Sequence, residues 1–214
     1  NKNILLQAAT GSGKTVMASA FVKHMIEQNK NVLFLAHRRE LITQCSDKLT
    51  KEGIKHGIIM AGETAQFWHN TQVASIDTLR SRSITNKTEE LPKADLVIID
   101  EAHRSLSKTY LKIIGMYADS QVLGLTATPI RSDGKGLGYI FSDMVKAPSI
   151  ATLIEQGHLV SCQYFAPTIP DLNGIQNYMG DYNATELANR MDKPKLIGDI
   201  VSSWKKIANN KKTI

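Results

Sequence analysis

Short, nearly uninterrupted apolar runs alternate with longer amphipathic stretches along most of the chain. The longer stretches at 14–29 and 38–52 carry apolar side chains at roughly helical spacing, and we expect them to form helices. Apolar strands separated by helices are typical of a parallel sheet that is covered on both faces. The sequence therefore predicts an α/β fold with a mostly parallel sheet. The expected strands lie at residues 3–8, 31–36, 56–61, 71–76, 95–100 and 121–127.

Composition limits the class of protein. Apolar residues make up 42% of the 214 residues and charged residues 21%, which is typical of a soluble globular protein with a hydrophobic core. The longest apolar runs, such as 96–99, are far shorter than the roughly 20 residues that a membrane span needs, so we expect no membrane partner. Cys45 and Cys162 show neither metal-ligand spacing nor a disulfide framework. We therefore expect a cytoplasmic protein.

A glycine-rich turn lies between the first expected strand and the first expected helix. Residues 8–15 read AATGSGKT, which fits a phosphate-binding loop with Ala8 where the general pattern has glycine. Its glycines let successive N–H groups point at phosphate oxygens, while its lysine reaches the β- and γ-phosphates and its final threonine binds Mg²⁺. The alternative is a glycine-rich turn with a chance Lys-Thr pair. The candidate nucleotide-binding residues are Thr10, Gly11, Ser12, Gly13, Lys14 and Thr15.

Two carboxylates end the apolar run at 95–100. Asp100 falls at the carboxyl end of the expected strand, where ligands of open α/β sheets bind, and can hold the Mg²⁺ that bridges the nucleotide phosphates. Glu101 can orient or deprotonate an attacking water. A simpler explanation is that this pair caps the next helix. Together with the phosphate-binding loop, the pair instead predicts a site for Mg-ATP, with Lys14, Asp100 and Glu101 as the candidate catalytic residues.

At this point the chain resembles a known family. The segments ATGSGKT, DEAH and TATP resemble motifs I, II and III of the superfamily 2 (DEAD/DEAH-box) helicases, in the family's order and spacing. The segment at 34–44, FLAHRRELITQ, is similar to their motif Ia, and 71–82 is similar to the next nucleic-acid-contacting segment. Within the superfamily, GLTATPIRSDGKGLG looks most like the branch shared by restriction-type and repair-type DNA translocases, including phage-borne members.

The resemblance implies a RecA-like P-loop NTPase fold and a role for each matching residue. Thr15 and Asp100 would bind Mg²⁺ beside ATP, and Glu101 would be the catalytic base. His103 would contact Thr126 and Thr128 and so couple the nucleotide to the nucleic-acid face. The residues implied to lie near the bound strand's backbone are His37, Arg38, Arg39, Glu40 and Thr78.

Residue chemistry supports part of the nucleic-acid assignment. Arg38 and Arg39 open a helix after a buried strand, which suits phosphate contact, although a solvated helix face is the alternative. The net charge of +6 is weakly indicative of an anionic partner. No aromatic cluster lies among the basic residues, so we expect no base-stacking platform. His37 fits packing better than base contact, and His103 can also be read as a helix-start residue with no coupling role. For Arg80 and Arg82, surface charge and a functional role remain equally open.

The chain changes character near residue 165. We expect a RecA-like ATP-binding domain at 1–164, a linker at 165–182, and the truncated start of a second RecA-like domain at 183–214, with helices at 184–191 and 193–208 and a strand beginning at the end of the chain. The glycine-rich stretch 131–138 predicts a mobile loop. Nothing matches motifs IV to VI, whose arginines complete the ATP site in this family, and no upstream glutamine segment is present. We therefore expect a fragment of a longer protein that hydrolyses ATP poorly by itself.

The expected function is the first motor domain of an ATP-dependent DNA helicase or translocase. Its expected partners are nucleic acid, with DNA favoured over RNA, and a second RecA-like domain in the full-length chain. An RNA-tracking helicase of the same superfamily is one alternative. A P-loop module that binds nucleotide without translocating is another.

Overall fold

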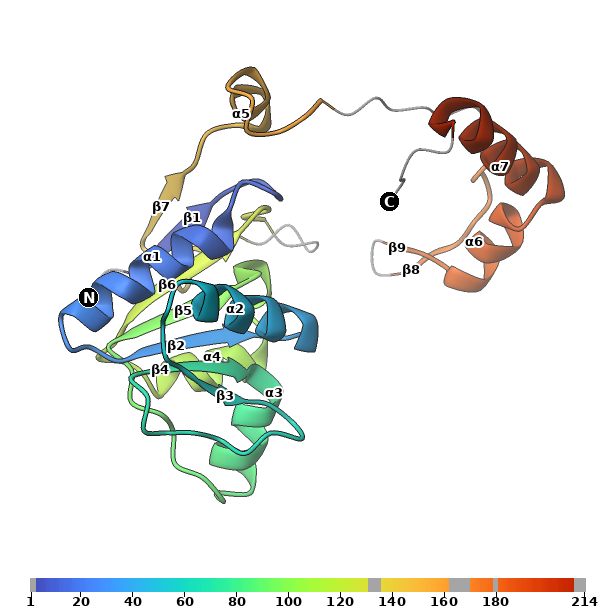
Figure 1. The fold of residues 1–214 in the computed structure, drawn as a ribbon. Coiled ribbons are helices and arrows are strands. Elements are labelled where there is room, and N and C mark those ends of the chain that lie inside the picture. Colours follow the sequence, from blue (N-terminus) through green and yellow to red (C-terminus); the bar gives the residue numbers. More distant parts are fainter. Residues whose placement is uncertain (1–2, 131–135, 162–169, 179–180, 210–214) are drawn as a thin grey trace. The chain divides into compact units, whose positions relative to one another are not determined.

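The structure is a computed structural model that describes residues 3–130, 136–161, 170–178 and 181–209. The chain separates into two compact units, Asn1–Val160 and Ser161–Ile214, which are described separately (Figure 1). Part of the stretch expected to be a mobile loop, part of the expected linker and the expected final strand lie outside the described residues.

A parallel sheet forms the centre of the first unit. Its strand order is β3-β4-β2-β5-β6-β1-β7, and every neighbouring pair is parallel. This confirms the predicted α/β class, and each apolar run expected to be a strand contributes one. The strands are β1 (Ile4–Gln7), β2 (Val32–Ala36), β3 (Gly57–Ile59), β4 (Thr71–Ser75), β5 (Leu96–Asp100), β6 (Gln121–Thr126) and β7 (Asp143–Lys146).

Helices cover both faces of this sheet (Figure 1). The two predicted helices, α1 (Lys14–Glu27) and α2 (Arg39–Lys51), lie on one face. The other face carries α3 (Ile76–Leu79), a π-helical turn at Arg80–Thr85 and α4 (Lys108–Gly115). No helix in the described part of the chain is long and apolar enough to cross a membrane.

The alternation of side chains along β2 shows why both faces need a cover. Phe34 packs with Val22 of α1 and Ile42 of α2, whereas Leu33 and Leu35 belong to the cluster on the opposite face. All five residues of β2 are buried. A strand whose alternate residues enter two different cores must be apolar throughout, which is the pattern that the sequence displays.

Several elements of the first unit, α3 and the π-helical turn among them, were not expected from the sequence. The strand β7 is exposed along its whole length and pairs with β1 alone, and its four residues form neither a long apolar run nor an alternation. The helix α4 follows a 3-10 turn at Ala102–Arg104, and α5 (Ile150–Glu155) has only six residues. The side chain of Ser149 caps α5 by accepting from the N–H of Thr152.

The second unit contains α6 (Ala184–Met191) and α7 (Pro194–Ala208), at the positions of the two predicted helices. Asn183 caps α6 by accepting from two backbone N–H groups, and Pro194 opens α7 at a position where its missing N–H is not needed. The stretch expected to be an irregular linker also holds a short antiparallel hairpin. Its strands are β8 (Asn177–Tyr178) and β9 (Asp181–Tyr182), and two residues per strand are too few for a visible period.

Candidate functional site

The glycine-rich turn and the two carboxylates lie at the same edge of the sheet. β6 lies between β1 and β5, and the three strands are parallel, so their carboxyl ends adjoin. The N–H of Ala8, just after β1, donates to the carbonyl of Thr126 at the end of β6 over 2.9 Å. Asp100, at the end of β5, pairs in register with Leu125 of β6. The sequence elements expected to bind Mg-ATP are therefore brought together by adjacent strand ends.

The turn itself has the backbone form of an anion site. Gly11 and Gly13 have φ angles of 80° and 89°, in the left-handed region that favours glycine. The hydroxyl and N–H of Ser12 both bind the carbonyl of Ala9, at 2.7 and 3.1 Å, which closes the loop. No side chain caps the start of α1, so the first N–H groups of this 14-residue helix can bind an anion.

Lys14 folds back over the loop. Its Nζ donates to the carbonyl oxygens of Ala8 and Ala9, each at 3.3 Å. Ala8 is buried, which explains why a small residue suffices where the general pattern has glycine. The ammonium group is thus held beside the backbone that would surround a phosphate, bound only by neutral acceptors that a phosphate would outcompete.

Asp100 is half-buried at the end of β5, and one of its oxygens accepts from the N–H of Glu101 at 3.0 Å. Burial raises the pKa of this carboxyl above its ordinary value, while the Glu101 N–H and the Lys14 charge act in the opposite direction. Its second oxygen and the hydroxyl of Thr15 are hard oxygen ligands of the kind that Mg²⁺ takes.

The described residues hold no group of three His, Cys, Asp or Glu side chains that could enclose a metal ion. Mg²⁺ in nucleotide sites is held by one or two protein oxygens, substrate phosphates and water. The few ligands at this edge of the sheet therefore fit Mg²⁺ bound together with a nucleotide rather than a metal cage built from protein alone.

Glu101 has an unusual backbone. Its φ and ψ angles of 52° and 51° are left-handed, which is rare for a residue other than Gly, Asn or Asp. Its carboxylate lies 3.2 Å from Nδ1 of His103, which is also 3.4 Å from Oγ1 of Thr126. The Thr126 hydroxyl in turn donates to the carbonyl of Thr128 and accepts from its N–H, at 2.9 and 3.1 Å.

These contacts assign the proton on His103. The one hydroxyl hydrogen of Thr126 is used by the Thr128 carbonyl, and the Glu101 carboxylate can only accept. Nδ1 of His103 must therefore carry the hydrogen that both oxygens face. The three residues expected to couple the nucleotide site to its surroundings are thus connected to Glu101 by one hydrogen-bond chain.

The residues expected near nucleic acid follow β2 and β4. His37 is half-buried just after β2, and burial followed by the charges of Arg104 and Arg38 lowers its pKa. Arg38 is exposed at the N-cap of α2, and Thr78 is half-buried in α3, where its N–H reaches the Ser75 hydroxyl at 3.5 Å.

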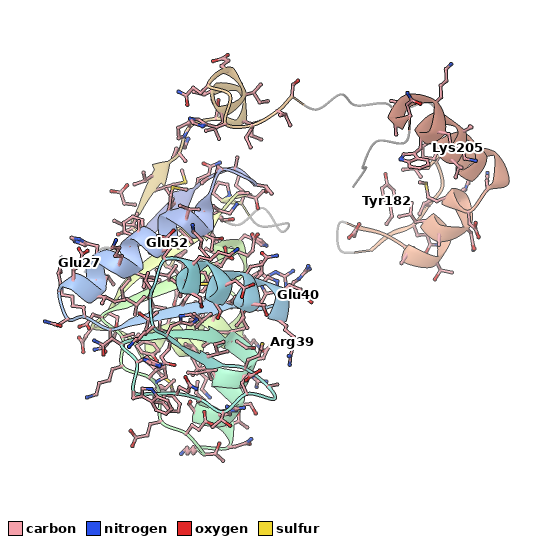
Figure 2. All side chains as sticks on the ribbon, viewed as in Figure 1. Glu27, Arg39, Glu40, Glu52, Tyr182 and Lys205 are labelled. Atoms are coloured by element: carbon pink, nitrogen blue, oxygen red, sulfur yellow. The ribbon has the colours of Figure 1, made fainter. Side chains whose placement is uncertain are left out.

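Two arginines hold the turn that follows β3. Arg39 donates to the carbonyl of Ala61 at 2.7 Å, and Figure 2 shows it beside Glu40 at the amino-terminal end of α2. Arg82 donates to the carbonyls of Met60 and Glu63. It also pairs with Glu89 at 3.1 Å. These contacts favour a structural role for Arg82. That role is a third possibility, because the sequence had suggested only surface charge or a functional role.

Sequence reasoning also missed residues beside the site. His37 and His103 line one pocket together with Asp77, Arg104 and Tyr110. Their positions along the chain give no common motif, because they follow different strands and meet only where the strand ends converge. The one available signal was the position of each segment directly after an expected strand.

Comparisons with known proteins indicate the family of this chain. Residues 1–131 match the family described as "Type III restriction enzyme, res subunit". A "51.5 kDa protein" of Lactococcus phage (isolate 7-9) is 31% identical over 98% of this chain and 42% of its own length. The "DNA 3'-5' translocase XPB2" of Sulfurisphaera tokodaii is 33% identical over 63% of this chain and 29% of its own length. The chain thus spans less than half the length of these relatives.

The fold has counterparts among solved structures. The helicase domain of Pyrococcus furiosus Hef superposes with a TM-score of 0.55 over 68% of this chain and 35% of that one, at 22% identity. Likeness at this level of identity concerns the arrangement of strands and helices, which is that of a RecA-like domain.

Proposed function

Because this chain belongs to the superfamily 2 helicases, in the family of the type III restriction enzyme res subunit, as an N-terminal motor domain, we propose that the intact protein uses ATP hydrolysis to move along DNA. One observation carries the proposal: Lys14 and the acids at 100 and 101 lie at adjoining strand ends, where one Mg-ATP would contact all three. DNA is favoured over RNA by the restriction-enzyme family and by the motif III sequence.

We assign roles at the nucleotide site from these contacts. The uncapped N–H groups at the start of α1 would bind phosphate oxygens, and Lys14 would leave its two carbonyl acceptors to reach the β- and γ-phosphates. Thr15 and Asp100 would hold Mg²⁺, which supplies neutralisation of the phosphate charge. Glu101 would orient the attacking water and accept its proton.

The chain from Glu101 through His103 to Thr126 and Thr128 would couple hydrolysis to movement. A shift of the end of β6 would move the Thr126 hydroxyl that shares the Nδ1–H of His103 with Glu101. The strength of the hydrogen bond between His103 and Glu101 would change with it. Arg38, His37 and Thr78, at the ends of β2 and β4, would lie nearest the backbone of the strand. Contacts of this kind hold the backbone without reading sequence.

Residues 165–182 would be a linker, and 183–214 would begin a second RecA-like domain. This is supported by the amphipathic helices α6 and α7 and by the greater length of the relatives. An arginine from a partner domain can contribute roughly 10³ to 10⁵ in rate, so residues 1–214 alone would hydrolyse ATP slowly. The compartment would be the cytoplasm, since Cys45 is a buried free thiol with no disulfide partner among the described residues.

The test is phosphate release by the intact protein with Mg-ATP and either single-stranded DNA, duplex DNA or RNA. DNA should stimulate turnover more than RNA, and Lys14→Ala should abolish it while Lys23→Ala, an exposed lysine on the same helix, should not. Glu101→Gln should bind ATP and fail to release phosphate. Stimulation by RNA alone would favour an RNA-tracking enzyme, and binding of ATP with no stimulation by either would favour a nucleotide-dependent binding module.

A further inference from the structure

A pocket of about 580 Å³ opens at the carboxyl edge of the sheet, between the ends of β2, β4, β5 and β6 and the start of α4. We call it the strand-end pocket, and its relevant lining residues are His37, Asp77, His103, Arg104, Tyr110 and Ile130. Its volume falls within the roughly 300 to 1,000 Å³ of sites for small ligands. It is large enough to hold more than a solvent molecule or a single ion.

The pocket presents two opposite charges that are not paired with each other. Asp77 and Arg104 are both exposed, and within the described part of the chain neither side chain has a hydrogen bond or an ion pair. A ligand that offers donors on one side and acceptors on the other would satisfy both groups. A bare phosphate would meet the guanidinium but would be repelled by the carboxylate.

Two further polar atoms at the pocket lack partners. Nδ1 of His37 and the hydroxyl of Tyr110, a residue only 3% exposed, are buried with no hydrogen bond among the described residues. Buried polar groups are nearly always satisfied, so such an orphan indicates a missing ligand or water. Burial lowers the pKa of His37, so its ring is neutral at pH 7. The lining thus offers unpartnered polar atoms beside one carboxylate and one guanidinium of opposite charge.

Building on the proposed function, we propose that the strand-end pocket binds an unpaired nucleobase of the tracked strand, and that guanine is the base it fits best. Guanine carries two adjacent donors, N1–H and the N2 amino group, which suit the carboxylate of Asp77. Its O6 and N7 acceptors suit the guanidinium of Arg104. Each of the other bases can contact both charged groups, but none has two adjacent donors on one edge together with two adjacent acceptors on another, so none can pair with both groups through two bonds each. Ile130, which is 64% exposed, offers an apolar surface for the ring.

Only an unpaired base fits this chemistry. N1 and N2 of guanine are engaged by cytosine in a duplex, so Asp77 can reach them only in a single strand. The bound base would also adjoin His103, whose ring holds the carboxylate of Glu101. Occupancy of the pocket therefore bears directly on the group that serves the attacking water.

The experiment measures binding of the intact protein to fluorescently labelled oligothymidylate by anisotropy. The central residue is thymine, guanine, hypoxanthine, 7-deazaguanine or an abasic site. Guanine should bind about tenfold more tightly than thymine. Hypoxanthine, which lacks the N2 amino group, and 7-deazaguanine, which lacks N7, should each lose several-fold of that gain.

Two variants assign the contacts. Asp77→Asn should abolish the difference between guanine and hypoxanthine, and Arg104→Gln should abolish the difference between guanine and 7-deazaguanine. Asp47→Asn, an exposed acid on α2, is the matched control and should preserve both differences. Both pocket positions are exposed, and a thermal melt checks that each variant folds.

The outcomes separate this proposal from the proposed function. Equal binding of all five strands, with DNA-stimulated ATPase intact, would overturn base capture and leave the motor assignment standing. An abasic strand that binds as tightly as the guanine strand would point to a phosphate as the occupant and would also overturn it. Failure of every strand to bind, with no stimulation of ATPase, would overturn both.

Discussion

Nδ1 of His103 lies 3.2 Å from Oε2 of Glu101, so one ring positions the carboxylate that would serve the attacking water. Because the same ring faces Thr126, we expect His103→Ala to lower the kcat of DNA-stimulated ATP hydrolysis by roughly a hundredfold through misplacement of Glu101. The KM for ATP should change little, since Lys14 and Thr15 remain.

Steady-state kinetics of the intact protein would test this effect of His103. His103→Asn, whose amide can donate to Glu101, should retain most of the activity. His24→Ala, at an exposed histidine on α1, is the control. An alanine variant at 103 with undiminished kcat would remove the positioning role.

The left-handed backbone of Glu101 predicts a trade between stability and activity. Such a conformation costs a residue with a Cβ about 1–2 kcal/mol, and glycine avoids that cost but loses more entropy on folding. We expect Glu101→Gly to raise the free energy of unfolding by about 0.5–1 kcal/mol while abolishing hydrolysis. Glu101→Gln should abolish hydrolysis without the gain. Urea denaturation of the two variants compares them, and equal stabilities would show that residue 101 is not strained.

Gly124 should not tolerate a side chain. A Cβ at this position in β6 would lie 2.5 Å from Cζ of Phe141 and 2.9 Å from Cβ of Ala102. Gly124→Ala should therefore lower the free energy of unfolding by about 1–3 kcal/mol. Gly115→Ala is the control, because nothing lies within 4 Å of that Cβ and alanine favours the helix end. Thermal denaturation that ranked the two variants in the opposite order would contradict the close packing at β6.

His37 predicts a pH-dependent stability. Its pKa is lowered from the ordinary value of 6.5, so below pH 6.5 the unfolded chain binds more protons at this residue than the folded chain does. Stability contributed by neutral His37 is therefore present above that value and declines as the pH falls below it. His37→Gln should flatten the dependence of the free energy of unfolding on pH between about 5 and 7. An unchanged slope in urea titrations across that range would show that His37 is solvated.

Much of the fold was predictable because its central strands are buried on both faces. β2 and β5 read as apolar runs for that reason alone, and the glycine turn after β1 marks the candidate phosphate site without any tertiary information. The peripheral β7 was missed because its two apolar residues, Met144 and Val145, are adjacent and so lie on opposite faces of an exposed edge strand, which gives no apolar run or alternation. The short α5 was missed because six residues do not complete two helical turns.

The candidate site was predictable only where neighbouring residues act together. Asp100 and Glu101 are adjacent in sequence, and so are Lys14 and Thr15. The contacts of Arg39 and Arg82 with the turn after β3 were hidden, since backbone carbonyls leave no trace in a sequence pattern. Asp77 and Arg104 share a pocket through strand order, which no local pattern reveals.

The strand order also bears on how this chain comes to be folded. β1 pairs with β6 and β7, so the two residues that pair with Ile4, Leu123 and Asp143, lie far later in the chain. Contacts so distant in sequence form slowly, and on the ribosome they cannot form until most of this unit has been synthesised. The loop that would hold ATP is thus translated well before β6 and β7, and it is secured only when those strands pair with β1.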